Sequence, residues 1–387
     1  MPASRPARIL RIAMNGVTGR MGYRQHLLKA ILPLRDQGGV TTAEGTRVQV
    51  EPVLVGRDAG RLREIAERHG VRDWTTDLDT VLSDPSVDVY FDAQVTSRRV
   101  AAIRAALAAG KHVYTEKPTA ETLTDAVDLA RAARQAGVTV GAVHDKLYLP
   151  GLVKLRRLAD EGFFGRILSL RGEFGYWVFD GETQPGQRPS WNYRHEDGGG
   201  ITLDMFCHWN YVLEHLIGPV EAVTARTAVH VPVRRDELGH RYEVTADDAV
   251  YGIFELGGGA IAQINSSWAA RVHRDELIEL QVDGTRGSAV AGLRRCVAQS
   301  LSHTPRPVWD PDTPVTESFR DQWLEVPANA DLTGAFRWQW EEFLLDVVAG
   351  RPHRHDFLSA ARGVQLARLG LRSAEEGRRV EVPGIAL

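Results

Sequence analysis

The chain has 387 residues, of which 43% are hydrophobic and 25% charged, and its formal net charge is −3. This length favours two domains, each able to bury a sizeable core. The nearly balanced charge gives no reason to expect a nucleic acid or a membrane surface as a partner.

The sequence offers no pattern for membrane insertion, export or metal binding. No window approaches the roughly 20 apolar residues of a membrane span, and residues 1–8 lack an apolar core of signal-peptide length. Cys207 and Cys296 fit no zinc spacing, and the histidines do not cluster with carboxylates at ligand spacing, so no metal is implied. We therefore expect a cytoplasmic protein in a reducing compartment.

A glycine-rich turn follows the first predicted strand, residues 9–14, and precedes a helical pattern over residues 25–34. Its glycines are spaced GxxGxxG rather than GxGxxG. A strand, glycine turn and helix in this order aim backbone N–H groups at a phosphate, although such turns also simply connect elements. The predicted cofactor-binding residues here are Gly16, Thr18, Gly19, Arg20 and Met21.

The end of the second predicted strand, residues 50–55, bears on the choice of cofactor. The strand follows a polar loop, residues 35–48, and ends in Gly56-Arg57-Asp58. An acidic residue at this position usually bonds the ribose 2′-hydroxyl of NAD, whereas an arginine accommodates the 2′-phosphate of NADP. Arg57 therefore predicts a preference for NADP, while Asp58 keeps NAD possible. The alternative is that Arg57 is a solvated residue at a helix start.

The remaining pattern of the first third alternates between strands and helices. Strands are predicted at residues 87–93, 112–115 and 138–143, and helices at residues 62–69, 78–82, 100–109 and 122–136. This alternation with short joints predicts a doubly wound parallel sheet, a Rossmann domain covering residues 1–145.

Two opposite charges follow the strand at residues 112–115. Pro118 keeps Lys117 out of helical geometry, so Lys117 is expected at the carboxyl end of the strand, where open α/β sheets bind ligands. The alternative is that Glu116 and Lys117 form a solvated surface pair.

Residues 146–387 predict a second, α+β domain, whose closing helices could pack on the first. A helix at residues 152–159 precedes strands at residues 167–176, 220–229, 249–256, 260–268 and 277–282. Strands joined by short turns, such as Gly257–Gly259, predict a large, mainly antiparallel open sheet. Its outer face must be covered, by a partner subunit or by other elements of the chain. We expect a homo-oligomer, a dimer or tetramer, formed through this sheet. Residues 305–314 predict a long irregular loop.

Asp204 and His208 form a second chemical pair. At positions i and i+4 they share one face of a helix, so a carboxylate and an imidazole can face one pocket, and histidine suits acid–base work near neutral pH. The alternative is an aspartate that stabilises the helix dipole and a core histidine.

A resemblance to the glucose–fructose oxidoreductase/inositol dehydrogenase (Gfo/Idh/MocA) family runs over most of the chain. The family signature is similar to residues 110–118, GKHVYTEKP, and further matches are residues 165–167, 190–193, 198–208 and 361–380. The resemblance implies a Rossmann domain followed by an α+β domain with an open sheet, which often forms the oligomer interface.

The resemblance also implies hydride transfer between a nicotinamide and a secondary alcohol of a sugar, cyclitol or glycoside. His208 would be the base and Asp204 would bind the substrate, while Lys117 would stabilise the developing alkoxide. Glu116 would position Lys117 or the nicotinamide end of the cofactor. The residues expected to contact the carbohydrate are Lys117, His144, Tyr176, Trp191, Tyr193, Arg194, Asp204 and His208. The alternative for the aromatic residues among them is that they belong to the core.

Two departures from the family pattern bear on these roles. Residues 94–99, QVTSRR, replace the usual proline or asparagine followed by histidine. The expected cofactor contact in this segment is Thr96, and Arg98 or Arg99 can have a role that differs from the family's. Tyr211 replaces the usual aspartate three residues after the motif histidine. Two rival functions stay open: a glycoside-processing enzyme with transient NAD-dependent oxidation, and a non-catalytic cofactor-binding regulator. The regulator predicts a damaged Lys117/His208 pair, whereas both residues are present.

Overall fold

The computed structural model describes residues 8–314, 316–329 and 334–387. The chain divides into two compact units, labelled here unit 1 and unit 2. Unit 1 comprises Met1–Tyr148, Gly334–Val364 and Ile385–Leu387, and unit 2 comprises Leu149–Thr333 and Gln365–Gly384. The second domain was predicted to cover residues 146–387, with closing helices that could pack on the first domain. In the structure, residues 334–364 are part of unit 1.

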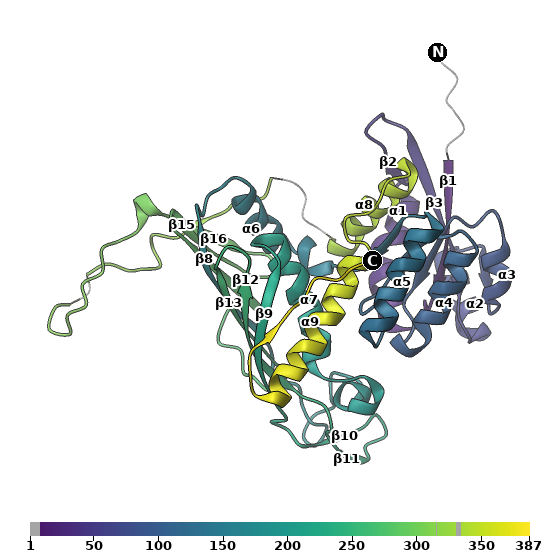
Figure 1. Ribbon diagram of the computed structural model, residues 1–387. Helices are drawn as coiled ribbons and strands as arrows, with labels where there is room; N and C mark the ends of the chain where they lie inside the picture. Colours follow the sequence, from purple (N-terminus) through teal and green to yellow (C-terminus); the bar gives the residue numbers. More distant parts are fainter. Residues whose placement is uncertain (1–7, 315, 330–333) are drawn as a thin grey trace. The chain divides into compact units, whose positions relative to one another are not determined.

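Unit 1 is built on a seven-stranded sheet, which confirms the predicted doubly wound fold (Figure 1). Its main strands run in parallel in the order β3-β1-β5-β6-β7, with the short strands β2 and β4 both paired to β3. The strands are β1 (Arg8–Asn15), β2 (Val40–Thr41), β3 (Arg47–Val55), β4 (Asp73–Thr75), β5 (Val89–Asp92), β6 (His112–Thr115) and β7 (Val140–Ala142). The polar loop predicted at residues 35–48 is wrong in part, because Val40 pairs antiparallel with Val48.

Helices cover both faces of this sheet. They are η1 (Met21–Ile31, π-helical), α1 (Leu32–Asp36), α2 (Ala59–His69), α3 (Leu78–Ser83), α4 (Thr96–Ala108), α5 (Leu123–Ala136), η2 (Asp145–Tyr148) and α8 (Ala335–Ala349). Successive residues of β1 face opposite sides: Leu10 and Ile12 join one buried cluster, whereas Ala13 joins the other. A core on each side is what a parallel sheet requires.

Local capping residues set several helix ends. The Asp58 side chain accepts a hydrogen bond from the Arg61 amide at the start of α2, and Thr122 does the same for Asp125 at the start of α5. Gly70 and Gly137 adopt the left-handed conformation at the ends of these helices. Helix α4 has no side-chain cap and begins at residue 96, four residues before its predicted start.

Helix α8 joins unit 1 from more than 180 residues beyond the last strand of its sheet, β7. Its buried residues Trp340, Phe343 and Leu344 lie in the cluster that also contains Leu27 and Ile31 of η1. Helix α9 (Phe357–Glu376) begins in unit 1 and ends in unit 2.

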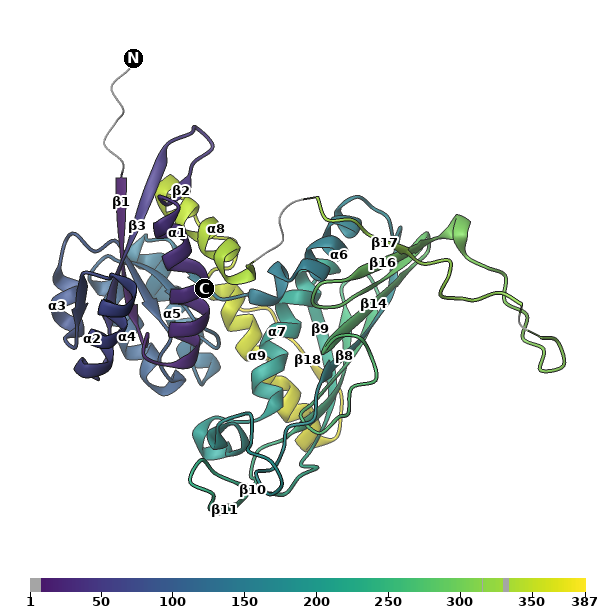
Figure 2. The same cartoon turned by 180° about the vertical axis from the view of Figure 1, so that it is seen from behind.

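Unit 2 contains a nine-stranded sheet in the order β17-β16-β15-β14-β8-β13-β12-β9-β18 (Figure 2). Neighbouring strands are antiparallel except for β13 and β8, which confirms a mainly antiparallel sheet. The strands are β8 (Ile167–Gly175), β9 (Val220–Ala228), β12 (Ala249–Leu256), β13 (Ile261–Ser267), β14 (Ile278–Gly284), β15 (Gly287–Ala291), β16 (Cys296–Ser300), β17 (Leu324–Glu325) and β18 (Val380–Glu381). Strands β15, β16 and β17 were not predicted, whereas β18 begins at the end of residues 361–380, which resemble the family's closing helix and strand.

Helices α6 (Pro150–Asp160), α7 (Ile201–Leu216) and the second half of α9 lie along one face of this sheet (Figures 1 and 2). The other face exposes large apolar side chains: Tyr251 and Ile253 of β12 and Ile261 of β13 are each 44–52% exposed. A separate hairpin pairs β10 (Val233–Arg235) with β11 (Arg241–Glu243), and short 3₁₀ turns occur at η3 (Ser190–Tyr193), η4 (His195–Asp197) and η5 (Leu301–His303).

Two loop predictions are confirmed in unit 2. The Gly257–Gly259 segment joins β12 to β13, with Gly258 and Gly259 at positive φ. Residues 305–314 contain no helix or strand, and Trp309 within them is fully exposed. Across the described ranges 8–314, 316–329 and 334–387, none of the helices combines the length and apolar character needed to cross a membrane.

Candidate active site

The glycine turn of unit 1 fits tightly against the end of β5. Gly16 has φ +82°, and a Cβ placed on it would lie 2.6 Å from the carbonyl carbon of Ala93. A Cβ on Gly22, in the first turn of η1, would lie 2.5 Å from the Gly16 carbonyl oxygen. Glycine is therefore required at both positions, and the turn leaves Gly19 and Arg20 exposed with Thr18 and Met21 half-buried. This geometry fits a phosphate-binding turn.

The end of β3 lies beside this turn, because the Gly16 amide donates to the Val55 carbonyl oxygen at 3.2 Å. A Cβ on Gly56 would contact Thr18 Cγ2 at 3.5 Å. Arg57 and Asp58 follow and are both exposed. Asp58 Oδ1 accepts from the Arg61 amide at 2.9 Å, so this carboxylate caps α2.

The end of β5 carries a buried carboxylate that we did not predict. Asp92 accepts hydrogen bonds from the Tyr90 hydroxyl at 2.6 Å, from Gln94 Nε2 at 2.8 Å and from Arg99 Nε at 3.2 Å. Arg99 is 3% exposed and also donates to the carbonyl oxygens of Gln94 and Pro118. Arg99 thus links α4 to the loop after β6. Thr96 is half-buried at the first position of α4.

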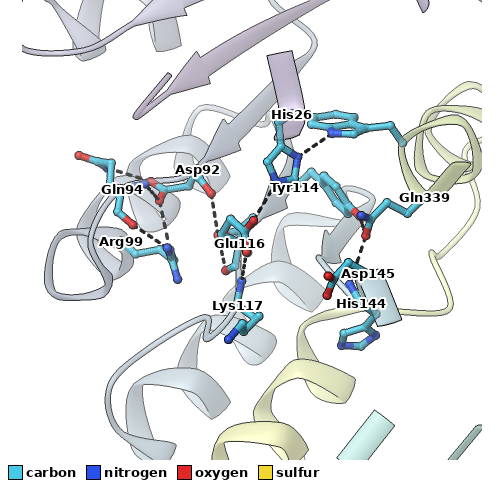
Figure 3. Close-up of polar contacts among 12 residues, drawn as sticks. His26, Asp92, Gln94, Arg99, Tyr114, Glu116, Lys117, His144, Asp145 and Gln339 are labelled. Carbon is cyan, nitrogen blue, oxygen red and sulfur yellow. Dashed lines mark hydrogen bonds and ion pairs between the residues drawn. The ribbon is translucent and has the colours of Figure 1, made fainter. Parts of the chain in front are cut away.

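The end of β6 holds Glu116 in a buried hydrogen-bond network (Figure 3). Glu116 Oε1 lies 2.8 Å from His26 Nε2, and Oε2 accepts from the Lys117 amide at 3.1 Å. Burial alone would raise the pKa of Glu116, but the hydrogen bond with His26 and the positive charges of Arg99 and Lys117 outweigh it and hold this pKa below its usual range. The glutamate is therefore a carboxylate at neutral pH, and the alternative of a solvated pair is wrong for it.

Lys117 stands at the carboxyl end of β6, as predicted, and is half-buried. In Figure 3 its side chain extends away from His26. His144 follows β7, the neighbouring strand, and is 3% exposed. The His144 amide donates to Gln339 Oε1 at 3.2 Å, and the Tyr114 hydroxyl donates to the same oxygen at 2.8 Å. Adjacent parallel strands thus bring Asp92, Glu116, Lys117 and His144 to one edge of the sheet.

Helix α7 of unit 2 presents Asp204 and His208 one turn apart. Close backbone approaches fix its start: a Cβ on Gly199 would lie 2.5 Å from the Trp191 carbonyl oxygen, and one on Gly200 would lie 2.5 Å from Asp247 Oδ1. The glycines before the motif are therefore needed for packing at the helix start.

Arg188 binds Asp204 and was not predicted as a site residue. Its Nη2 donates to Asp204 Oδ2 at 2.9 Å and to Asn192 Oδ1 at 3.2 Å, and its Nη1 donates to the Tyr176 hydroxyl at 3.3 Å. The guanidinium lies 4.1 Å from the centre of the Trp268 ring. Burial disfavours the cation, but the Asp204 carboxylate and Tyr176 outweigh this and raise the pKa of Arg188. Asp204 is thus one half of an ion pair.

His208 is 4% exposed, and its Nδ1 lies 2.5 Å from the Tyr211 hydroxyl. Tyr211 is the residue that replaces the usual family aspartate. A tyrosine hydroxyl can donate or accept here but carries no charge at neutral pH, so His208 has a neutral partner at Nδ1.

The other residues predicted to contact substrate lie in different surroundings. The Tyr176 hydroxyl accepts a hydrogen bond from Arg188, and Trp191 is 50% exposed. Tyr193 is buried between the Arg234 guanidinium, 4.0 Å from its ring, and Trp268; burial raises its pKa. Arg194 lies 4.7 Å from the centre of the Tyr242 ring. Substrate contact by each of these residues stays a prediction. Within the described ranges, no group of three or more His, Cys, Asp and Glu side chains could hold a metal ion.

Family models match both parts of the chain. Residues 10–144 match the model described as an oxidoreductase family with an NAD-binding Rossmann fold, and residues 152–290 match the GFO/IDH/MocA C-terminal domain. The chain belongs to the Gfo/Idh/MocA family. Its first unit is therefore the NAD-binding Rossmann domain of an oxidoreductase, as predicted.

Two curated relatives illustrate the range of this family. D-xylose dehydrogenase from Paenarthrobacter nicotinovorans is 68% identical over 383 residues, covering 98% of this chain and 99% of the relative. Levoglucosan dehydrogenase from Pseudarthrobacter phenanthrenivorans is 26% identical over 64% of this chain and 66% of its own length. A solved structure of levoglucosan dehydrogenase with NADH and L-sorbose has a TM-score of 0.80 at 22% identity and covers 98% of this chain and all of its own, which supports the fold.

Proposed function

We propose that this protein is a dehydrogenase that oxidises a secondary alcohol of a sugar, with D-xylose as the first substrate to test and NADP as the preferred cofactor. The observation that carries the proposal is the 68% identity to a D-xylose dehydrogenase over nearly the whole of both chains. Lys117, Asp204 and His208 are all present, so the chain retains the polar groups that such a reaction needs.

The NADP preference rests on the residues after β3. Arg57 is exposed beside the glycine turn, whereas the Asp58 carboxylate already caps α2. A ribose 2′-phosphate would gain a planar cation from Arg57. NAD is the second candidate, since Asp58 has a further carboxylate oxygen that can accept a hydrogen bond.

Bound cofactor supplies the hydride acceptor, and the chain's own residues handle the proton and the developing charge. His208 takes the proton of the reacting hydroxyl as general base. The Lys117 ammonium stabilises negative charge on that oxygen, and the Glu116 carboxylate behind it favours the charged form of Lys117. Asp204, held by Arg188, accepts a hydrogen bond from a sugar hydroxyl and orients the ring.

Further sugar contacts are assigned to His144, Tyr176, Trp191, Tyr193 and Arg194. Aromatic faces and multiple hydrogen-bond donors suit carbohydrate surfaces. Among these residues, exposed Trp191 is the best placed to meet a ligand without rearrangement, and buried Tyr193 is the least.

The deciding experiment is a turnover screen of D-xylose, other sugars, inositols and glycosides with NADP and NAD in parallel. We expect reduced cofactor to accumulate with D-xylose or a related sugar, and faster with NADP at limiting concentration. Glycoside cleavage without release of reduced cofactor would instead identify the transient-oxidation enzyme. Tight cofactor binding without turnover of any alcohol would identify the regulator and refute the proposal.

We also assign a homo-oligomer to the open face of the nine-stranded sheet. The support is the group of exposed apolar residues on it, Tyr251, Ile253 and Ile261. Light scattering coupled to size-exclusion chromatography should give a dimer or tetramer, and Ile253→Arg should shift it toward the monomer. A monomeric wild-type protein would overturn this assignment.

A further inference from the structure

A buried series of hydrogen bonds in unit 1 connects α8 to Glu116 and Lys117 through His26, a residue outside the family signature. Trp340 Nε1 donates to His26 Nδ1 at 2.9 Å, His26 Nε2 lies 2.8 Å from Glu116 Oε1, and Glu116 Oε2 accepts from the Lys117 amide at 3.1 Å. The side chains of Trp340, His26 and Glu116 are 0–8% exposed. This series of hydrogen bonds thus runs through the protein interior and ends at Lys117, the residue assigned to catalysis.

The hydrogen-bond partners of His26 determine which of its ring nitrogens carries the proton. An indole N–H only donates, so His26 Nδ1 must accept and carries no hydrogen. The hydrogen of the neutral imidazole then lies on Nε2 and points at Glu116 Oε1. His26 is therefore a neutral donor to Glu116, and the carboxylate keeps its full negative charge.

We propose that His26 is a positioning residue for Lys117: through its Nε2–H it keeps Glu116 oriented and ionised behind the lysine. The proposal rests on the assignment of Lys117 to catalysis made above. The charge that Glu116 keeps favours the ammonium form of Lys117, and the second carboxylate oxygen holds the Lys117 amide at the strand end.

The other groups that face Glu116 do not replace His26. Arg99 of α4 bonds Asp92 and two carbonyl oxygens, so its charge is largely committed. Asp92 of β5 reaches Glu116 through its carbonyl oxygen, which accepts the Glu116 amide at 2.8 Å. The Tyr114 hydroxyl of β6 donates to Gln339, and the pKa of Tyr114 is raised, by burial first, so that it stays neutral.

Loss of His26 has a predictable chemical effect. Burial raises the pKa of Glu116, and the hydrogen bond from His26 Nε2–H counteracts this effect. Without that donor, the pKa of Glu116 rises. Protonation of Glu116 then removes the negative charge beside Lys117. Turnover should fall as the pH decreases through this new value, whereas a general loss of packing would lower turnover equally at all pH values.

The test uses His26→Phe, because His26 packs with its ring 4.4 Å from Phe91 and 5.0 Å from Phe336, so an aromatic ring suits the site. We expect kcat at pH 7 to fall about 10- to 100-fold, the loss typical of residues that orient a functional group, with an acid limb that the wild-type profile lacks. His26→Gln, which can still donate to Glu116, should recover most of kcat and remove the limb. If His26→Phe does not fold, His26→Leu replaces it.

Two further variants separate a positioning role from a structural one. Glu116→Gln has no carboxylate to titrate, so the double variant His26→Phe/Glu116→Gln should lack the new acid limb and be no slower than the slower single variant. Trp340→Phe removes the other hydrogen bond of His26 but keeps the donor to Glu116, so its pH profile should also lack the new limb. A His26→Phe profile parallel to the wild-type profile, or fully additive losses in the double variant, would overturn the proposal.

Lys117→Ala distinguishes this inference from the proposed function. Loss of turnover in Lys117→Ala together with a wild-type pH profile in His26→Phe would defeat the role of His26 alone. Retained turnover in Lys117→Ala would defeat the assignment on which it rests.

Discussion

Substitution of Gly22 tests whether the glycine turn of unit 1 holds the cofactor phosphates. A Cβ at this position would lie 2.5 Å from the Gly16 carbonyl oxygen and 3.0 Å from its carbonyl carbon. Both atoms belong to the backbone, so no side-chain rotation relieves the contact. In Gly22→Ala, the turn and η1 must separate by roughly one ångström to restore ordinary contact distances.

The cost of this separation sets the expected effect. Overpacking of this kind costs about 1–3 kcal/mol, and about 1.4 kcal/mol corresponds to a tenfold change in a dissociation constant. If the bound phosphate restores the native turn, the cost appears in binding, and the Kd for NADP or NAD rises about 5- to 150-fold. If the strain is retained in the free protein instead, it appears as a lower midpoint of thermal unfolding.

Cofactor titration by fluorescence, together with calorimetric unfolding, distinguishes these two outcomes. Gly384→Ala is the matched control, because a Cβ there meets no atom within 4 Å, and it should leave both measurements unchanged. A Gly22→Ala protein with wild-type Kd and wild-type unfolding would refute the reasoning, since the predicted overlap would then have no energetic consequence.

Four further substitutions test the remaining site assignments. Arg57→Ala should raise the Kd for NADP by about tenfold or more, the worth of a charge-assisted hydrogen bond, while the Kd for NAD changes little; equal effects would remove the argument for NADP. Lys117→Ala and His208→Ala should each lower kcat at least 100-fold with the cofactor Kd within about threefold, and near-wild-type turnover in both would contradict the assigned roles. Arg188→Met should raise the sugar KM more than it lowers kcat, because Asp204 loses its orienting partner; an unchanged KM would show that the Asp204 carboxylate is held by other groups.

Local signals made several elements predictable from the sequence. The α2 helix ends at Gly70, which adopts the expected left-handed conformation, and β6 spans the predicted residues 112–115. The position of Lys117 at the end of β6 followed from Pro118, whose ring restricts the preceding residue. In each case the determining residue lies within a few positions of the feature that it sets.

Elements that depend on distant partners were missed. Helix α8 is stabilised by burial of Trp340, Phe343 and Leu344 against residues of β1 and η1, more than 300 positions away in the sequence. Strand β2 has two residues and pairs with the start of β3 inside a segment whose polar residues indicate a loop. Neither pairing leaves a periodic pattern in the sequence.

The same distinction applies to the site. Glu116 and Asp204 were predictable because each belongs to a compact motif, but their partners His26 and Arg188 lie on another helix and on an irregular loop. His26 occupies a buried position of η1 and resembles an ordinary core histidine in sequence. Arg188 lies among the glycines and prolines of residues 181–189, where no periodicity assigns a direction to a side chain. Contacts of this kind follow from tertiary structure.

The two motif carboxylates are held in opposite ways, and this difference suits the roles of their neighbours. Glu116 is bound by a neutral donor, His26, so its negative charge stays available to favour the Lys117 ammonium. Asp204 is bound by a full cation, Arg188, so it contributes little net charge beside His208, whose Nδ1 partner Tyr211 is also neutral. The Glu116 carboxylate therefore favours the ammonium form of Lys117, whereas the charge of Asp204 is already balanced by Arg188. This contrast agrees with the roles proposed for the two neighbours, stabilisation of the oxyanion by Lys117 and acceptance of the proton by His208.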